Sequence, residues 1–178
     1  MTVEAQIDAQ TDLGAQDCPM NAEPQPQHRW LLKLVGDWTY ESEAQMGPDQ
    51  PPTKSAGRQS TRAVGELWIM GEGRGDMPDG EPMHTVITLG YDPAKQQFVG
   101  TFIGSMMTWL WPYSGTLDDS GKVLTLASEG PSFTDPAQMS PYQDVLEVVD
   151  DDHHILRSRM PGPDGDWVEF MTAHYRRV

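Results

Sequence analysis

From Gly36 to the end of the chain, short apolar runs alternate with short groups of turn residues, and this pattern limits the fold more than any other feature. The runs are rich in Trp, Tyr, Phe, Val, Ile and Thr, which favour β-strands, and nothing after Gly36 is typical of a helix. They predict about ten strands, at residues 36–45, 54–64, 66–73, 83–91, 96–104, 107–117, 122–129, 142–149, 154–160 and 166–176.

The connections between these strands are short and carry turn residues. Residues 92–95, DPAK, suit a type I turn because proline occupies the second position. Residues 118–121, DDSG, and 163–166, PDGD, likewise separate apolar runs. Sequential strands with such connections form an antiparallel meander, and a long meander normally closes on itself to remove its edges. We therefore predict an all-β fold, an antiparallel closed β-barrel.

The N-terminal residues differ from the rest of the chain in composition. Residues 1–27 hold five acids, no Lys or Arg and no aromatic residue. We expect a disordered or loosely docked acidic tail over 1–27, followed by a single barrel domain over 28–178. Apolar residues at helical spacing, ending before the stop signal Gly36, predict one short helix over about 27–35.

The net charge excludes some classes of partner. The chain has 12 Lys and Arg against 27 Asp and Glu, a formal charge of −15 and a pI near 4.4. Nucleic acids and anionic membrane surfaces require clustered positive charge, so neither partner is expected. Cys18 is alone, the first residues lack a secretory-signal pattern, and no apolar run approaches the roughly 18 residues of a membrane span. These features favour a soluble, cytoplasmic protein.

Three segments resemble a known bacterial family. HRWLLKLVGDWTYE at 28–41, TLGYDPAKQQFVGTFIGSMM at 88–107 and GDWVEFMTAHYRR at 165–177 are similar to the family catalogued as domain of unknown function 1579. The resemblance covers roughly residues 28–178, all but the tail. It implies a lipocalin-like, calycin-type β-barrel, and it brings no established activity and no catalytic motif.

A more distant resemblance concerns one end of the barrel. Gly36, Asp37 and Trp38 resemble the G-x-W opening of lipocalins, in which the Trp closes a barrel end beneath an Arg from the last strand. The resemblance implies that Trp38 is structural, with Arg176 or Arg177 as the residue that stacks on it.

The densest group of potential metal ligands is the segment DDDHH at 150–154. Adjacent strand residues face opposite sides, so His153 and His154 do not readily share one metal. Calcium loops also need spaced ligands and a glycine at the bend. We interpret this segment as a solvated hairpin and expect no metal.

Two histidines, His84 and His174, lie in predicted strands that are rich in apolar residues. A buried histidine can orient a polar ligand, act as a base near neutral pH or bind a haem iron, and it can equally be hydrogen-bonded within the wall without further role. Haem also needs a large cavity, and we expect no cofactor.

A set of methionine and aromatic residues gives the remaining signal. Such side chains suit an adaptable apolar pocket, but they could equally fill the barrel or form a dimer interface. Residues two apart on a strand share a face, which groups Met107 with Trp109 and Trp111, Trp68 with Met70, His84 with Val86 and Thr88, and His174 with Phe170 and Thr172. If these groups form the inner wall, the candidate ligand-binding residues are Trp68, His84, Thr88, Met107, Trp109, Trp111, Phe170 and His174.

The function favoured by these features is the binding of a small, mainly apolar or aromatic molecule inside the barrel. One alternative is an enzyme in which Glu169 or His174 acts as acid or base in the same cavity. Another is an interaction module, a homodimer with a filled barrel. No Ser nucleophile, Cys–His pair or metal triad has convincing spacing, so no catalytic residue is assigned.

Overall fold

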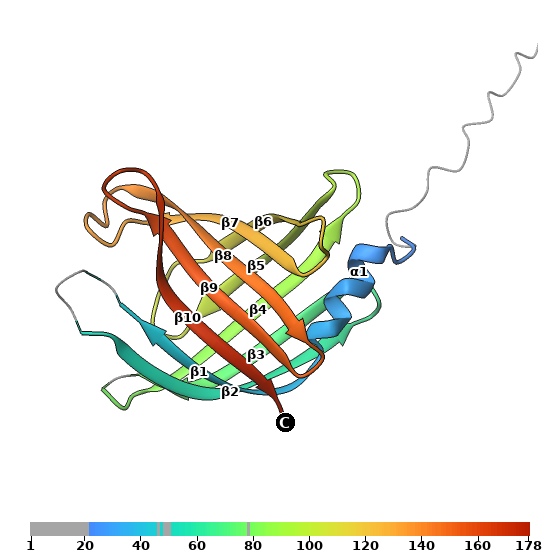
Figure 1. Ribbon diagram of the computed structural model, residues 1–178, viewed down its shortest axis with the longest axis horizontal. Helices are drawn as coiled ribbons and strands as arrows, with labels where there is room; N and C mark the ends of the chain where they lie inside the picture. Colours follow the sequence, from blue (N-terminus) through green and yellow to red (C-terminus); the bar gives the residue numbers. More distant parts are fainter. Residues whose placement is uncertain (1–21, 46, 48–50, 78) are drawn as a thin grey trace, which may run out of the picture.

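The computed structural model describes residues 22–45, 47, 51–77 and 79–178. Ten strands form a closed barrel in which each strand pairs with its neighbours in sequence and β1 closes on β10 (Figure 1). All pairs are antiparallel. This confirms the predicted fold. The strands are β1 Gly36–Ala44, β2 Thr53–Val64, β3 Trp68–Asp76, β4 Pro82–Asp92, β5 Gln97–Gly104, β6 Trp111–Leu117, β7 Val123–Pro131, β8 Met139–Asp150, β9 His153–Pro161 and β10 Trp167–Arg177.

A short helix precedes the barrel, as predicted. It consists of α1, Pro26–Leu31, and a final 3-10 turn, Leu32–Leu34. The chain then enters β1 at Gly36, whose φ of 142° favours glycine, and a β-carbon there would lie 2.1 Å from Nη1 of Arg177. Among the described residues, no helix combines the length and hydropathy needed to span a membrane. The greater part of the predicted acidic tail, residues 1–21, lies outside the described residues.

The helix covers one end of the barrel and fills it. Trp30, Leu31 and Leu34 are buried, and Nε1 of Trp30 donates to the carbonyl of Gly121 at 2.8 Å. The strands supply the rest of this core, namely Ile69, Leu89, Phe98, Tyr113, Leu124, Leu126 and Leu146. Leu124 and Leu126 are fully buried, so the interior next to α1 is packed with side chains.

Arg177 stacks on Trp38 at the same end of the barrel, which confirms the expected contact. The stacking residue is Arg177, because the side chain of Arg176 is exposed. The Trp38 side chain is 1% exposed, and Cζ of Arg177 lies 4.2 Å from its ring centroid. Nε1 of Trp38 donates to the carbonyl of Leu34 at 3.0 Å, and Nη1 of Arg177 donates to the carbonyl of Val35 at 2.8 Å. The last strand thereby ties the helix to the first strand.

The segment at 150–154 is only partly as predicted. The aspartates lie at the exposed turn between β8 and β9, but His153 and His154 are 8% and 4% exposed, so the expectation of a fully solvated hairpin is wrong. The two rings do face opposite sides. His153 stacks on His174 on the outer face, whereas His154 packs inside against Trp38 and Tyr175. Aromatic partners on both sides of the wall therefore bury both imidazoles.

Candidate functional site

A cavity of about 460 Å³ occupies the barrel at the end away from α1. Its described lining falls into three chemical groups: methionines, aromatic residues, and small or polar residues. These are Met77, Met83, Met106, Met107 and Met171; Phe102, Trp111, Tyr113, Phe133, Tyr142 and Phe170; and Ser42, Ala44, Thr53, Ser55, Asp76, Ser128, Asp144 and Ser158. Every strand or an adjoining loop contributes, so the fold itself creates this space.

Aromatic rings pack together in one part of the cavity wall. The ring centroids of Trp111 and Tyr142 lie 5.1 Å apart, and those of Phe133 and Phe170 lie 5.3 Å apart, both in edge-to-face geometry. Nε1 of Trp111 donates to Sδ of Met107 at 2.9 Å, and the Tyr142 hydroxyl donates to the carbonyl of Pro131 at 2.8 Å. These contacts hold the rings in place beside the cavity.

A carboxylate lies at the inner end of the cavity. The Tyr113 hydroxyl donates to Oδ2 of Asp144, and the Ser158 hydroxyl donates to Oδ1 at 2.5 Å. Asp144 also borders a second, much smaller void of about 40 Å³, which it shares with Leu34, Leu126 and other residues of the filled end. Asp144 therefore marks the boundary between the cavity and the packed core.

The electrostatic environment of this carboxylate is unusual. Burial raises the pKa of Asp144, and the hydrogen bonds from Ser158 and Tyr113 offset only part of that effect. Burial, and then the adjacent charge of Asp144, raises the pKa of the Tyr113 phenol well above its ordinary value. The described cavity lining contains Asp76 and Asp144 but no Lys, Arg or His. The cavity is thus mainly apolar with an acidic inner end.

Three of the predicted binding residues, Met107, Trp111 and Phe170, line this cavity. Phe170 was grouped with His174 by spacing, but the register of β10 against β9 shifts between Glu169 and Met171. Such a bulge turns a residue to the other face of a sheet. Met107, Trp111 and Phe170 thus lie in the cavity wall, and that they contact a ligand remains a prediction.

Two predicted residues, Trp68 and Thr88, lie on the outer face, not on the inner wall. Both alternate with buried interior residues, Ile69 and Leu89. Trp68 is 42% exposed and covers Gly90, where a β-carbon would meet its ring at 2.4 Å. Thr88 Oγ1 lies 2.9 Å from Oγ1 of Thr101 on β5. The spacing rule grouped these residues correctly but could not assign the group to a face.

His84 and Trp109 also lie outside the cavity, where they share an outer hollow of about 380 Å³ with Ile103 and Leu110. The predicted strand 107–117 begins only at Trp111, so residues 105–110 form a loop in which alternation does not apply. Nε1 of Trp109 donates to the carbonyl of Glu129 at 3.2 Å. Of the residues that the structure describes, Met107 alone borders both the hollow and the cavity.

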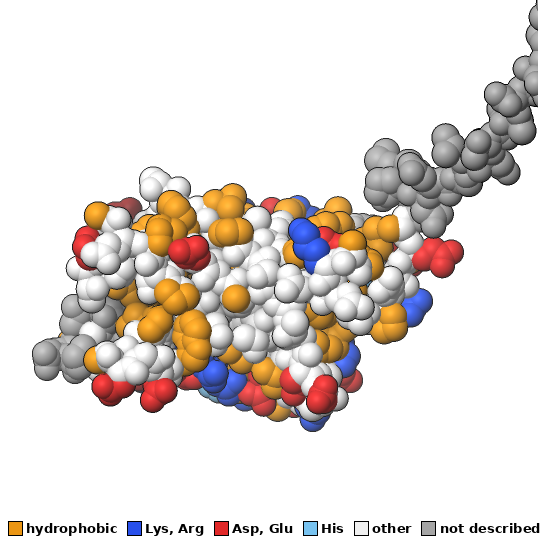
Figure 2. Space-filling view, turned by 90° about the horizontal axis from the view of Figure 1, so that it is seen from above, with side chains coloured by type: hydrophobic (Ala, Val, Ile, Leu, Met, Phe, Trp, Pro, Cys, Tyr) orange, Lys and Arg blue, Asp and Glu red, His pale blue; other side chains and the backbone are white. Residues whose placement is uncertain are grey.

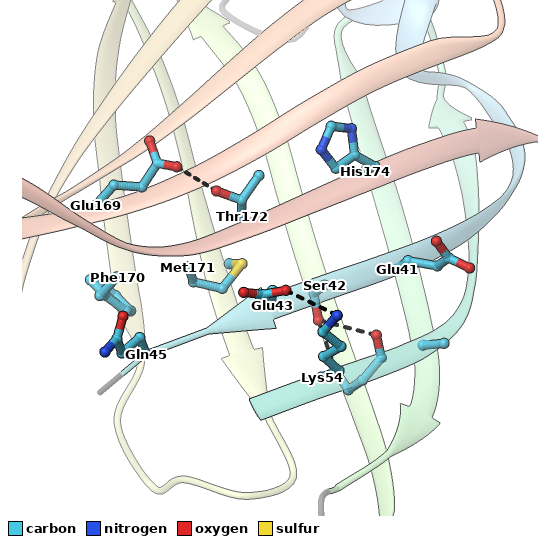
Figure 3. Close-up of a pocket in the computed structure, with 12 residues that line it drawn as sticks. Glu41, Ser42, Glu43, Gln45, Lys54, Glu169, Phe170, Met171, Thr172 and His174 are labelled. Carbon is cyan, nitrogen blue, oxygen red and sulfur yellow. Dashed lines mark hydrogen bonds and ion pairs between the residues drawn. The ribbon is translucent and has the colours of Figure 1, made fainter. Parts of the chain in front are cut away.

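His174 and Glu169, the proposed acid or base, lie along an outer groove of β10, β1 and β2 (Figure 3). The prediction that either acts inside the cavity is therefore wrong about their position. Nδ1 of His174 lies 3.2 Å from Nε2 of His153. Glu169 accepts from Thr172 and lies 3.8 Å from Nε of Arg157. The imidazole of His174 and the carboxylate of Glu169 therefore both interact with neighbouring side chains.

Apolar side chains are also exposed around the end of the barrel that holds the cavity. Figure 2 shows hydrophobic groups on the surface at its left end, which is the end of the barrel opposite α1 in Figure 1. The exposed apolar residues in the loops and adjoining strand ends at this end include Met106, Met107, Trp109, Leu110, Phe133, Met139, Trp167 and Val168. The described part of the chain holds no cluster of three or more His, Cys, Asp or Glu able to bind a metal.

Asp144 was not among the predicted site residues, although the strand that carries it was predicted. Tyr142, Asp144 and Leu146 alternate along β8, and the two apolar residues are buried. An acid on the buried face of a strand is the signal that could have identified it.

The sequence matches the family described as "Protein of unknown function (DUF1579)" over residues 23–177. The chain belongs to this family. The match confirms the resemblance seen in the three segments. A search of curated proteins finds no significant match.

Among solved structures, Rv2717c from M. tuberculosis aligns with a TM-score of 0.62 and 15% identity, covering 88% of this chain and 99% of that chain. The S-type phycobiliprotein lyase CPES from Guillardia theta aligns with a TM-score of 0.57 and 11% identity, covering 87% of this chain and 98% of that chain. At such identities the similarity establishes the barrel fold alone.

Proposed function

We propose that the protein binds one small, mainly apolar or aromatic molecule in the cavity of the barrel. The observation that carries this proposal is the cavity of about 460 Å³ beside a barrel half that is otherwise packed. This volume lies within the range of about 300–1,000 Å³ for small-molecule sites. Methionine and aromatic walls with a few polar groups are the lining that such sites use.

The exposed apolar residues near the cavity support the same function. Met106 and Met107 border the cavity and are 39% and 37% exposed. A ligand that reaches this rim can therefore move from exposed apolar side chains to enclosed ones. Methionine adapts to different ligand shapes because its side chain is unbranched and polarisable.

The proposal is tested by titrating the protein with an apolar naphthalene probe while energy transfer from tryptophan is recorded. We expect saturable transfer with one site per chain. Ser128→Phe should abolish it, because Ser128 lines the cavity and its side chain would grow into the space. Ser114→Phe is the matched control, since Ser114 is exposed on the outer face of β6.

A second pair of variants locates the probe without blocking the cavity. Trp111→Phe removes an energy-transfer donor from the cavity wall and should reduce the transfer to the bound probe. Trp68→Phe removes a tryptophan from the outer face and should reduce the transfer less, with the affinity unchanged. Equal binding by Ser128→Phe and Ser114→Phe would show that the probe binds elsewhere, and an absence of saturable binding across apolar probes would contradict the function.

An enzymatic function in the same cavity is the second candidate, and one observation favours it. Burial raises the pKa of Asp144, which is a common feature of carboxyl groups that exchange protons with substrates. In that case Asp144, and not Glu169 or His174, would be the acid or base. Turnover of a bound probe that Asp144→Asn abolishes without weakening binding would establish this role.

The homodimer hypothesis has a separate test. Its version with a completely filled barrel does not fit a cavity of this size, but the exposed side chains of Trp109 and Leu110 remain available for a partner. Sedimentation of the wild-type chain and of Trp109→Ala should reveal a dimer that the substitution weakens. A wild-type monomer at high concentration would contradict the hypothesis.

A further inference from the structure

The charged residues in the described lining of the cavity all have the same sign. Asp76 and Asp144 are the only charged residues in the described lining of the cavity. The arginines of β9 lie on the other side of the wall, where Arg157 pairs with Glu147 at 2.7 Å and Arg159 lies 3.9 Å from Glu169. The strand alternation that carries Ser158 into the cavity carries both arginines out of it.

Asp144 has no cationic partner among the described ion pairs. Its two hydrogen-bond donors, the hydroxyls of Tyr113 and Ser158, are neutral. A carboxylate offers about four lone-pair positions, so about two remain after these bonds. A buried carboxylate without a counter-charge is costly, and a cation that enters its site removes much of that cost. Burial raises the pKa of Asp144 because it disfavours the charged form, and a cation bound beside the carboxylate would favour that form again.

The walls beside Asp144 are suited to the same kind of ligand. Phe102, Trp111 and Tyr142 line the cavity, and the faces of aromatic rings carry negative potential that attracts ammonium groups. A carboxylate in the same position would meet the charge of Asp144, with no basic residue in the described lining to compensate it.

On these grounds we infer that the cavity selects apolar amines, with the ammonium group at Asp144 and the apolar body along the methionine and aromatic walls. The inference rests on the proposed function, and it adds the chemical class of the ligand. Fatty acids and other apolar carboxylates are then poor ligands of this barrel, although their apolar parts would fit equally well.

The test uses three naphthalene probes of equal length whose side chains end in an ammonium, a hydroxyl or a carboxylate group. Dissociation constants are measured at physiological salt, which screens the general attraction of a chain with a charge of −15. We expect the ammonium probe to bind at least about tenfold more tightly than the carboxylate probe, as a cation–π contact and a buried counter-charge together imply.

Asp144→Asn keeps the shape of the side chain and removes its charge. It should bring the affinities of the ammonium and carboxylate probes to within about threefold of each other and leave that of the hydroxyl probe nearly unchanged. Asp164→Asn is the matched control, because Asp164 lies exposed in the turn between β9 and β10 and its substitution alters the net charge by the same amount.

A further variant covers the case in which Asp144→Asn fails to fold. Asp144→Leu combined with Tyr113→Phe removes the carboxylate together with one of its hydrogen-bond donors, so the phenol is not left without its partner. The preference for the ammonium probe should be lost in this double variant, and a preference that persists in it would contradict the role of Asp144.

The outcomes separate this inference from the proposed function. If all three probes bind wild type alike, or if the preference persists in a folded Asp144→Asn, the cavity binds apolar molecules but Asp144 does not select amines. If no probe binds, both the inference and the proposed function are wrong. A preference lost in Asp144→Asn and kept in Asp164→Asn supports the inference.

Discussion

The two halves of the barrel interior are built from the same ten strands but packed differently. Next to α1, Leu31, Leu124 and Leu126 are almost inaccessible, and the helix fills the end of the barrel. At the other end no helix of the described residues enters, and methionine and aromatic side chains surround a cavity. Asp144 lies at the boundary of the two. We infer that the packed half supplies most of the stability of the fold, whereas the half with the cavity is where the proposed ligand would bind.

Removal of the indole that closes the filled half should have the largest effect on stability. Trp38→Ala deletes a ring that is 1% exposed, together with its stacking on Arg177 and its hydrogen bond to Leu34. We expect a loss of about 3–5 kcal/mol in the free energy of unfolding, measured with urea. Unchanged stability would show that this end of the barrel is not the stabilising half.

Two alanine substitutions, one in each half of the barrel, compare the packing of the two halves directly. Leu126→Ala in the filled half should cost about 2–5 kcal/mol, because the side chain is fully buried and leaves a void. Met83→Ala should cost less than about 1–2 kcal/mol, because Met83 already borders open space and loses fewer contacts. Equal losses in urea unfolding would contradict the difference in packing.

The pH dependence of stability provides an effect of intermediate size. Burial lowers the pKa of His154 from 6.5 to about 3, so this ring stays neutral in the fold while it gains a proton in the unfolded chain below pH 6.5. The contribution of neutral His154 to the free energy of unfolding is present above pH 6.5 and is lost as the pH falls toward 3.

Between pH 7 and pH 5 this loss should amount to about 2 kcal/mol, at about 1.4 kcal/mol per pH unit. Urea unfolding of wild type and His154→Gln at the two pH values isolates the contribution of His154. The variant should show a smaller decrease than wild type. An equal decrease would mean that His154 titrates normally in the fold.

The smallest effect is expected from the N-terminal residues that precede both halves. A chain that begins at residue 22 lacks an acidic, aromatic-free segment with little apolar area to repay ordering. Its melting temperature should lie within a few degrees of that of the full chain, and ligand affinity should not change. A larger loss would show that residues 1–21 contact the barrel.

The sequence was sufficient to predict the strands and the closure of the barrel, because turn residues and β-branched or aromatic runs are local signals. It could not assign each strand to a face. Trp68 and Thr88 lie on the outer face, where the Trp68 ring covers Gly90 and the Thr88 hydroxyl pairs with that of Thr101 across the strands. A bulge in β10 and a loop before Trp111 disrupted two further predictions of alternation. Such irregularities depend on long-range pairing, which a single sequence does not display.

Asp144 illustrates the same limit from the other side. Its strand was predicted, but its importance depends on Tyr113 and Ser158, which come from β6 and β9 and meet it only in the closed barrel. The candidate site could thus be predicted in its apolar character and not in its acidic end.

Binding of a ligand in the half of the barrel away from α1 can be followed through the methionine methyl groups. Met77, Met83, Met106, Met107 and Met171 line the cavity, whereas Met70 lies on the outer face of β3 and Met139 is 47% exposed. In a chain with ¹³C-labelled methionine methyl groups, titration with the naphthalene ammonium probe should shift the cavity signals together, with one saturation curve, and leave Met70 and Met139 unshifted. Shifts confined to Met70 or Met139, or no saturable shift of the cavity methyl groups, would contradict ligand binding in this half of the barrel.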